Sequence, residues 1–111
     1  MNANNLPIAI FNGTVATTNG LYRITDIEVE YAKKLVKKYG VISAVGHEAT
    51  AVIMTELLGV EIPLNRIQFH QETTQIAIVF KLNVRPPEGT ILTIKELESI
   101  GFGLKLMERL E

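Results

Sequence analysis

The stretch QIAIVFKL, Gln75–Leu82, contains a continuous apolar run, Ile76–Phe80, that is rich in β-branched side chains. A short run of this kind is typical of a strand that is buried on both faces of a sheet. We therefore expect it to be a central strand. The segment PIAIFNG, Pro7–Gly13, has the same apolar character and ends in turn residues, which predicts a second buried strand.

Helical patterns lie between these two strands. Thr25 and Glu28 form a T-x-x-E capping box, which predicts a helix that begins at Thr25 and ends at Gly40. Its apolar stripe would consist of Ile27, Tyr31, Ala32, Leu35 and Val36. A connector, Val41–Gly46, would lead to a second helix from His47 to Leu58, with Gly59 as its stop and a buried stripe made of Val52, Ile53 and Leu57.

Shorter elements complete the expected fold. We expect a short strand at Leu21–Ile24, and a hairpin in which Arg66–His70 pairs with Gln75–Leu82 around the turn Gln71–Thr74. A second capping box, Thr93 with Glu96, predicts a short helix ending near Gly101, and the tail FGLKLMERL predicts a last strand. Two segments, Thr14–Gly20 and Asn83–Thr90, are expected to be loops. The sum is one α/β domain over residues 1–111, with a mixed sheet of about five strands flanked by two or three helices.

Composition excludes several classes of protein. The chain of 111 residues contains no cysteine, so it has neither disulfides nor a thiolate nucleophile or zinc ligand. Its formal net charge of −1 argues against a broad basic face for duplex DNA but permits a short anionic ligand. No apolar run approaches membrane length and no secretion signal is apparent, so we expect a cytoplasmic protein without a membrane partner. Neither a metal-binding motif nor a nucleotide-binding glycine loop is present, so we expect no metal and no cofactor.

His47 follows Gly46 at the expected start of the second helix. Free N–H groups and the helix dipole favour an anion there, phosphate above all. A bound phosphate favours a protonated imidazole, so a histidine in this position can donate a proton once its ligand has arrived. Gly46 would allow a close approach of the backbone to the ligand. The alternative is a histidine that only caps or packs at the helix start.

Other polar groups are weaker candidates. Arg85 and Glu88 lie in the stiff segment R-P-P-E-G, where the guanidinium suits phosphate, although a solvated surface pair is the alternative. Asn12, Gly13 and Thr14 follow the first predicted strand, at an end where ligands bind in open α/β sheets, and the alternative is an ordinary turn. For Asn65 with Arg66 the alternative is a surface turn, and for His70 a structural role in a strand is favoured.

Four segments together resemble one known family: FNGTV (Phe11–Val15), SAVGHEAT (Ser43–Thr50), LLGVEIPLNR (Leu57–Arg66) and RPPEGTILT (Arg85–Thr93). They are similar to the viral and bacterial type III CRISPR ring nucleases, first described as small archaeal virus proteins of unknown function. Viral members act as anti-CRISPR proteins. The combined spacing of the G-H-[DE]-x-T, N-R and R-x-x-E-G elements is specific, whereas each alone is weak.

This resemblance implies a homodimer that binds cyclic tetra-adenylate across its interface. It also implies metal-independent cleavage to linear di-adenylate with 2′,3′-cyclic phosphate ends, which switches off type III CRISPR signalling. His47 falls on the general acid of the family, and Arg85 and Glu88 complete the implied catalytic set. The residues assigned to substrate binding are Asn12, Gly13, Thr14, Gly46, Thr50, Asn65 and Arg66.

The chain departs from the family pattern at two positions near these motifs. Ala49 stands where viral members tend to have serine, so the resemblance does not carry over a hydroxyl contact to the ligand at this position. Pro87 stands where we expect an acidic residue. Two other functions compete with the enzyme: a dimer that sequesters the cyclic nucleotide without cutting it, and a small structural or DNA-associated viral protein, which the near-neutral charge disfavours.

Overall fold

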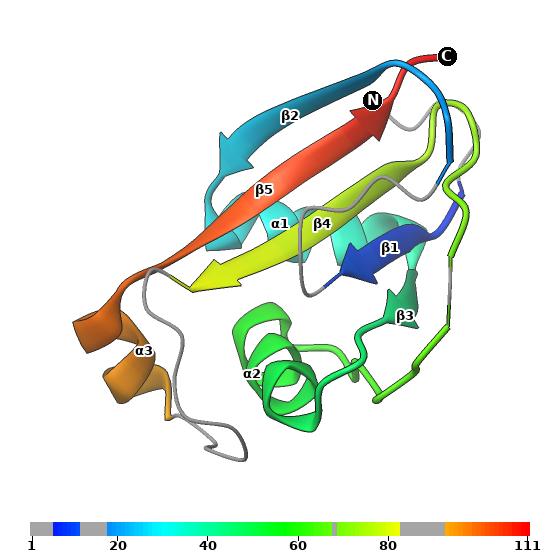
Figure 1. Ribbon diagram of the computed structural model, residues 1–111. Helices are drawn as coiled ribbons and strands as arrows, with labels where there is room; N and C mark the ends of the chain where they lie inside the picture. Colours follow the sequence, from blue (N-terminus) through cyan, green and yellow to red (C-terminus); the bar gives the residue numbers. More distant parts are fainter. Residues whose placement is uncertain (1–5, 12–17, 68, 83–92) are drawn as a thin grey trace.

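A computed structural model describes residues 6–11, 18–67, 69–82 and 93–111 (Figure 1). The elements in chain order are β1 (Ile8–Phe11), β2 (Tyr22–Ile27), α1 (Val29–Tyr39), β3 (Val41–Ala44), α2 (Glu48–Leu58), β4 (Ile76–Leu82), α3 (Ile94–Ile100) and β5 (Phe102–Arg109). The five strands form one sheet in the order β2-β5-β4-β1-β3. The predicted fold class, a mixed sheet of about five strands with two or three helices, is confirmed.

One side of the sheet, β4-β1-β3, is parallel, and the other side, β2-β5-β4, is antiparallel. β1 pairs in parallel with both β3 and β4, so that Ile10 lies opposite Ser43 and Ile78. β5 runs antiparallel between β4 and β2. Every residue of β1 is buried, as is the run Ile76–Phe80 of β4. Both apolar runs are therefore the buried strands that the sequence predicts, because neither face of these strands meets water.

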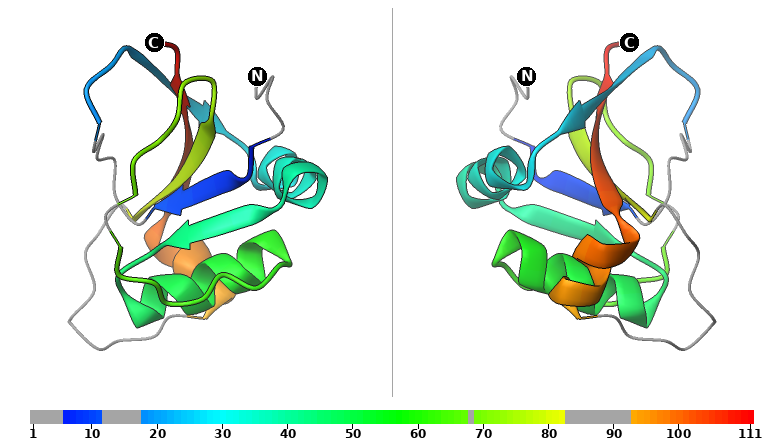
Figure 2. Two further views of the ribbon diagram at one scale, coloured as in Figure 1. Left: turned by 90° about the vertical axis from the view of Figure 1, so that its right-hand side faces the viewer. Right: turned by 90° about the vertical axis from the view of Figure 1, so that its left-hand side faces the viewer.

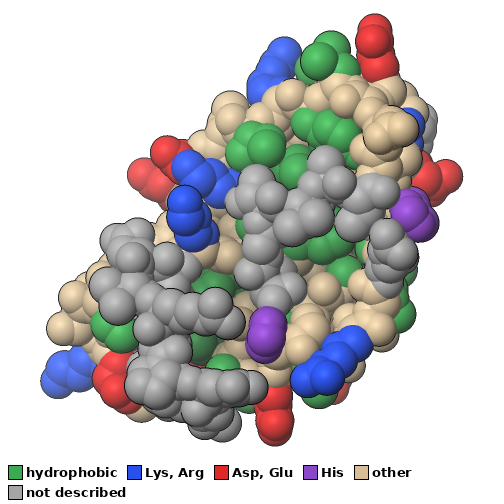
Figure 3. All heavy atoms as spheres, viewed as in Figure 1, with side chains coloured by type: hydrophobic (Ala, Val, Ile, Leu, Met, Phe, Trp, Pro, Cys, Tyr) green, Lys and Arg blue, Asp and Glu red, His purple; other side chains and the backbone are tan. Residues whose placement is uncertain are grey.

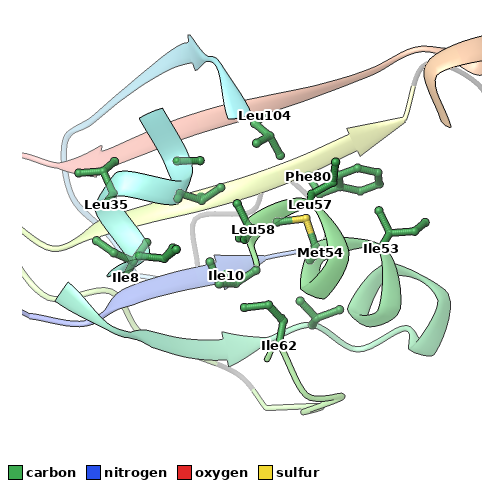
Figure 4. Packing of buried hydrophobic residues seen from close by; sticks show 14 of the residues in the cluster. Ile8, Ile10, Leu35, Ile53, Met54, Leu57, Leu58, Ile62, Phe80 and Leu104 are labelled. Carbon is green, nitrogen blue, oxygen red and sulfur yellow. The ribbon is translucent and has the colours of Figure 1, made fainter. Parts of the chain in front are cut away.

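One face of the sheet packs against α1 and α2 (Figures 1 and 2). In the close view of Figure 4, Ile10 of β1 lies near Leu58 of α2, and Ile8 lies near Leu35 of α1. Burying one such aliphatic side chain contributes about 1.5–3 kcal/mol relative to leaving it exposed. The buried stripe of α1 is Ala32, Leu35 and Val36, as predicted. This core holds the two helices at defined places behind the sheet.

The opposite face of the sheet carries a smaller apolar cluster. Its buried members alternate in sequence with those of the main core, and they are Ala9, Phe11, Ala44, Ala77, Val79 and Met107. The ring of Phe69 packs against that of Phe11, with ring centroids 6.1 Å apart and planes tilted by 55°. Phe69 lies in the irregular segment between α2 and β4, so this segment crosses toward the end of β1.

The predicted capping box at Thr25 is wrong. Thr25 lies inside β2, opposite Leu106 of β5, and α1 starts only at Val29, with Glu28 as an N-cap that makes no side-chain capping bond. Ile27, assigned to the helical stripe, is the last residue of β2 and pairs with Leu104. Pairing with β5 therefore extends the predicted strand Leu21–Ile24 beyond the local helix signal, since each added residue gains ladder bonds.

Two further expectations about the sheet are wrong. Val41–Ala44 is a strand, β3, rather than part of a connector, because it pairs in parallel with β1. Arg66–His70 does not form a hairpin with β4, and the described residues of this stretch are not in a strand. β4 instead pairs with β1 and β5, which occupy both of its edges. The count of five strands was right, although one of the expected strands was not.

The boundaries of the other helices follow the predicted signals. α2 runs from Glu48 to Leu58, with His47 as N-cap and Gly59 as a left-handed C-cap at φ 72°. Thr93 and Glu96 form the predicted capping box of α3, in which the Glu96 N–H donates to Thr93 Oγ1 over 3.1 Å. The assignment of Val52 to the buried stripe of α2 is wrong, because Val52 is 36% exposed whereas its neighbour Ile53 is buried.

Candidate functional site

The carboxyl ends of three parallel strands meet at one edge of the sheet. Phe11, the last residue of β1, lies opposite Ala44 at the end of β3 and opposite Val79 of β4. Such an edge is where ligands bind in open α/β sheets. The predicted site residues Asn12, Gly13 and Thr14, which follow β1 in sequence, lie outside the described residues. So do Arg85 and Glu88, which follow β4. The described part of the candidate site is the connection between β3 and α2, residues 45–47, which we call the β3–α2 corner.

His47 stands at the start of α2 with an exposed side chain. Its backbone is extended, at φ −124° and ψ 127°, and its carbonyl oxygen accepts the first helical bond from Ala51 N over 3.0 Å. The imidazole makes no capping hydrogen bond. His47 thus occupies the N-cap position, but its exposed side chain neither caps the helix nor packs in the core.

The backbone N–H groups of the first turn of α2 point toward the same region. Glu48, Ala49 and Thr50 precede the first N–H that is bonded within the helix, that of Ala51. Unbonded N–H groups at a helix start carry partial positive charge and favour an anion. Thr50 lies one turn after His47, half-buried, so its hydroxyl belongs to the same end of the helix.

Arg66 is brought to this corner from the segment that follows α2. Its Nε donates to the carbonyl oxygen of Gly46 over 2.9 Å, and its side chain is exposed. A Cβ built at Gly46 would lie 3.5 Å from Arg66 Cγ, so the arginine stem passes close over the glycine. Within the described part of the chain, the terminal nitrogens of Arg66 donate to no other group. A guanidinium with a free fork thus lies beside the residue that precedes His47, as a phosphate site requires.

Asn65 contacts the same corner but directs its donors at the backbone. Its Nδ2 donates to the carbonyl oxygen of Ser43 over 2.8 Å, and its backbone N–H donates to that of Val45, also over 2.8 Å. Asn65 is among the residues expected to bind substrate, whereas these bonds to Ser43 and Val45 give its side chain and backbone a structural role. Ser43 was missed altogether, although it opens the SAVGHEAT stretch. A serine inside a short apolar run was the available signal.

His70 is not in a strand, contrary to the sequence-based expectation. Its side chain is exposed, and Nδ1 lies 3.0 Å from the hydroxyl of Thr18. Both histidine side chains are visible on the face shown in Figure 3, which is the view in which α1 lies behind the sheet. The bond to Thr18 gives His70 a local structural partner.

The described residues contain neither a metal-binding cluster nor a membrane-spanning helix. Within residues 6–11, 18–67, 69–82 and 93–111, no three His, Asp or Glu side chains are arranged to hold a metal ion. Across the same ranges, every helix is too short or too polar to cross a membrane.

Comparison with known proteins places the chain in a family. The family model described as STIV B116-like matches residues 8–104. The chain belongs to this family. The solved structure of B116 of Sulfolobus turreted icosahedral virus superposes with a TM-score of 0.74 over 93% of this chain and 99% of that one, at 18% sequence identity. At this identity the likeness shows a shared fold, and it agrees with the five-stranded sheet described above.

Relatives with higher sequence identity to this chain come from viruses and from a bacterium. Uncharacterized protein 26 of Sulfolobus islandicus filamentous virus is 42% identical over 84 residues, which are 75% of this chain and 71% of that protein. Protein YddF of Bacillus subtilis is 35% identical over 96% of this chain and its own full length. ORF117 of Acidianus two-tailed virus is 36% identical over 81% and 80% of the two chains. The resemblance to small archaeal virus proteins is thereby confirmed, and the ring-nuclease activity stays a prediction.

Proposed function

We propose that the protein is a metal-independent ring nuclease, which binds cyclic tetra-adenylate and cleaves it to linear di-adenylate with 2′,3′-cyclic phosphate ends. The observation that most supports this proposal is that Arg66 is bonded to Gly46, the residue that precedes His47. An exposed imidazole that makes no capping hydrogen bond stands at a helix start, and a guanidinium is bonded to the preceding residue, Gly46, over 2.9 Å. A proton donor and an anion-binding group are thus combined in one place.

The chemistry requires little more than these groups. RNA carries its own nucleophile, the 2′-hydroxyl beside each phosphodiester. Attack of this oxygen on phosphorus forms the 2′,3′-cyclic phosphate, and the bond from phosphorus to the 5′-oxygen breaks. The 5′-oxygen takes its proton from His47, while the proton of the 2′-hydroxyl passes to solvent. A general acid contributes a factor of about 10²–10⁴ in rate, and placement of the reacting atoms can contribute about 7–11 kcal/mol.

The phosphate would be held by the free N–H groups of α2 and by the fork of Arg66. Hydrogen-bond donors fixed before the reaction stabilise the charge that develops on the phosphoryl oxygens without having to reorganise. Arg85 is proposed to add a second guanidinium, and Glu88 to orient Arg85 or a ribose hydroxyl. Both roles rest on the resemblance, since these two residues lie outside the described part.

The active form is proposed to be a homodimer. A ring of four nucleotides can adopt twofold symmetry, and so can two copies of one chain. A ring bound on the twofold axis would face two copies of His47, and two opposed cuts would release two dinucleotides. Four phosphates need only a few cationic groups contributed twice, which is compatible with the formal net charge of −1.

The decisive experiment incubates the purified protein with labelled cyclic tetra-adenylate in the presence of EDTA. Conversion to di-adenylate with a cyclic phosphate end is the expected result. A stable complex with an intact ring would instead support the alternative function, sequestration of the messenger without cleavage. Failure to bind the ring would exclude both. Parallel reactions with the six-membered ring define the ring size, and light scattering with and without ligand measures the oligomeric state.

A further inference from the structure

The segment Ile62–Arg66, here called the strap, runs from α2 to the β3–α2 corner and is hydrogen-bonded at both of its ends. At its start, the N–H of Ile62 donates to the hydroxyl of Thr55 on α2 over 2.9 Å. That hydroxyl donates in turn to the carbonyl oxygen of Ala51, one turn earlier, over 2.8 Å. At its end, Arg66 Nε donates to Gly46 O over 2.9 Å. The strap therefore joins the helix that follows His47 to the turn that precedes it.

Ser43 and Asn65 form the middle of this connection. The Ser43 hydroxyl, on a residue only 4% exposed, donates to the carbonyl oxygen of Pro63 over 2.6 Å and accepts from the N–H of Val45 over 3.3 Å. Asn65 donates two hydrogen bonds to the backbone before His47, from Nδ2 to Ser43 O and from its N–H to Val45 O, each over 2.8 Å. Breaking such buried or partly buried bonds is costly, because the polar group that remains has neither its protein partner nor full access to water.

The position of the His47 imidazole depends on this network because the side chain has no hydrogen bond of its own at the helix start. Its location follows from the backbone of Val45 and Gly46 on one side and from the first turn of α2 on the other. The strap is bonded to both sides and also carries Arg66. The separation between the imidazole and the guanidinium is thus set by bonds that involve Ser43 and Asn65.

We propose that Ser43 and Asn65 are positioning residues, which hold His47 and Arg66 in register for one phosphate. This proposal rests on the proposed function, because it presumes that His47 and Arg66 act on the same ligand. It reassigns Asn65 from ligand contact to backbone contact, and it adds Ser43, whose hydroxyl is directed at Pro63 and Val45. In-line cleavage is sensitive to such placement: a displacement of about 1 Å can cost about 10²-fold in rate.

The kinetic test uses Ser43→Ala and Asn65→Asp, the second of which replaces the amide donor by an oxygen that repels Ser43 O. We expect kcat for the four-membered ring to fall by about 10- to 100-fold, with a smaller change in KM. Ile8→Val is the control, since it removes one buried methyl group at the far end of β1 and lowers stability without touching the strap. A similar loss of kcat in Ile8→Val would mean that the effect is general destabilisation, and the proposal would be wrong.

A second readout does not depend on cleavage. In NMR spectra of Ser43→Ala and Asn65→Asp we expect the ring signals of His47 to shift and those of His70 to stay, while the Asn65 N–H exchanges faster with solvent. Unchanged His47 signals and unchanged exchange would overturn the positioning role. If the wild-type protein cleaves no ring, the proposed function fails, and the spectra still decide whether these residues place His47. If Ser43→Ala does not fold, Asn65→Asp decides, because that side chain is only half-buried.

Discussion

Arg66 donates through Nε to the carbonyl oxygen of Gly46 over 2.9 Å, although the two residues are 20 positions apart in the chain. This bond uses one of the five N–H groups of the guanidinium. The others meet no acceptor in the described part of the chain. One side chain can therefore hold the turn before His47 and still offer its fork to an anion, which links the N-R and G-H motifs physically.

Arg66→Ala should weaken ring binding by about tenfold to a hundredfold, since hydrogen bonds to a charged group are worth about 1.5–3 kcal/mol. Arg66→Lys should recover only part of the loss, because an ammonium lacks the planar fork. Titration calorimetry in a His47→Ala background measures binding without turnover. The matched control is Arg23→Ala, at an exposed arginine of β2. Equal losses in the two alanine variants would point to net charge rather than to a placed contact.

His47→Ala should lower the turnover of cyclic tetra-adenylate by about 10²–10⁴-fold, the usual contribution of a general acid. Folding and ring binding should be largely kept, because the side chain is exposed and makes no capping bond. Single-turnover kinetics and thermal denaturation measure the two effects separately. His70→Ala is the control histidine, and we expect its rate to stay near that of the wild type. A His47→Ala protein with undiminished rate per folded molecule would remove His47 from the mechanism.

Gly20→Ala should destabilise the fold, because a Cβ at this position would collide with the backbone oxygen of Glu111 and would lie 3.0 Å from Arg109 Nε. Leu21 N donates to the same Glu111 oxygen over 3.2 Å, so the segments that flank β2 and β5 cannot separate here without losing that bond. Gly103→Ala is the control, since no atom lies within 4 Å of a Cβ built there. Urea denaturation should show a clear loss for the first variant and little change for the second. The reverse order would contradict the described contact.

Thr93→Ala should lower the free energy of unfolding by about 1 kcal/mol, the usual cost of losing an N-cap. Thr93 Oγ1 accepts from Glu96 N over 3.1 Å, and Glu96 Oε1 accepts from Thr93 N over 3.2 Å. Both bonds depend on the capping geometry at the start of α3. Denaturant titration against Lys95→Ala, an exposed change in the same turn, separates the cap from a general effect on the helix. Equal losses in the two variants would indicate that the box contributes nothing.

Local signals predicted those elements whose own residues determine them. The apolar run Ile76–Phe80 became a central strand, Gly40 and Gly59 ended helices, and Thr93 capped α3, because burial and capping act within a few residues. The same kind of signal failed at Thr25. There a T-x-x-E pattern lies in β2, since pairing with β5 outweighs one cap. The strand Val41–Ala44 was also not predicted, because four residues are too few to show a recognisable periodicity.

In the candidate site, too, the sequence predicts the residues that carry a local signal but not those that depend on distant contacts. His47 could be named from the sequence, because a histidine after a glycine at a helix start is visible as a pattern. Its nearness to Arg66 could be expected only by resemblance, and the expected hairpin at Arg66–His70 was wrong. The role of Ser43 was not foreseen, since it depends on a bond to Pro63, 20 residues away. No local pattern encodes such a pair.

The sequence by itself determined the α/β class, the two buried strands, the helix at Glu48–Leu58 and the histidine at its start. These features follow from the periodicity of apolar side chains and from caps, which act over a few residues along the chain. Only the tertiary structure decided that β3 lies beside β1, that β2 extends to Ile27, and that the strap brings Arg66 to Gly46. Those outcomes depend on hydrogen bonds between residues that are distant in sequence, which exist only once the sheet has assembled.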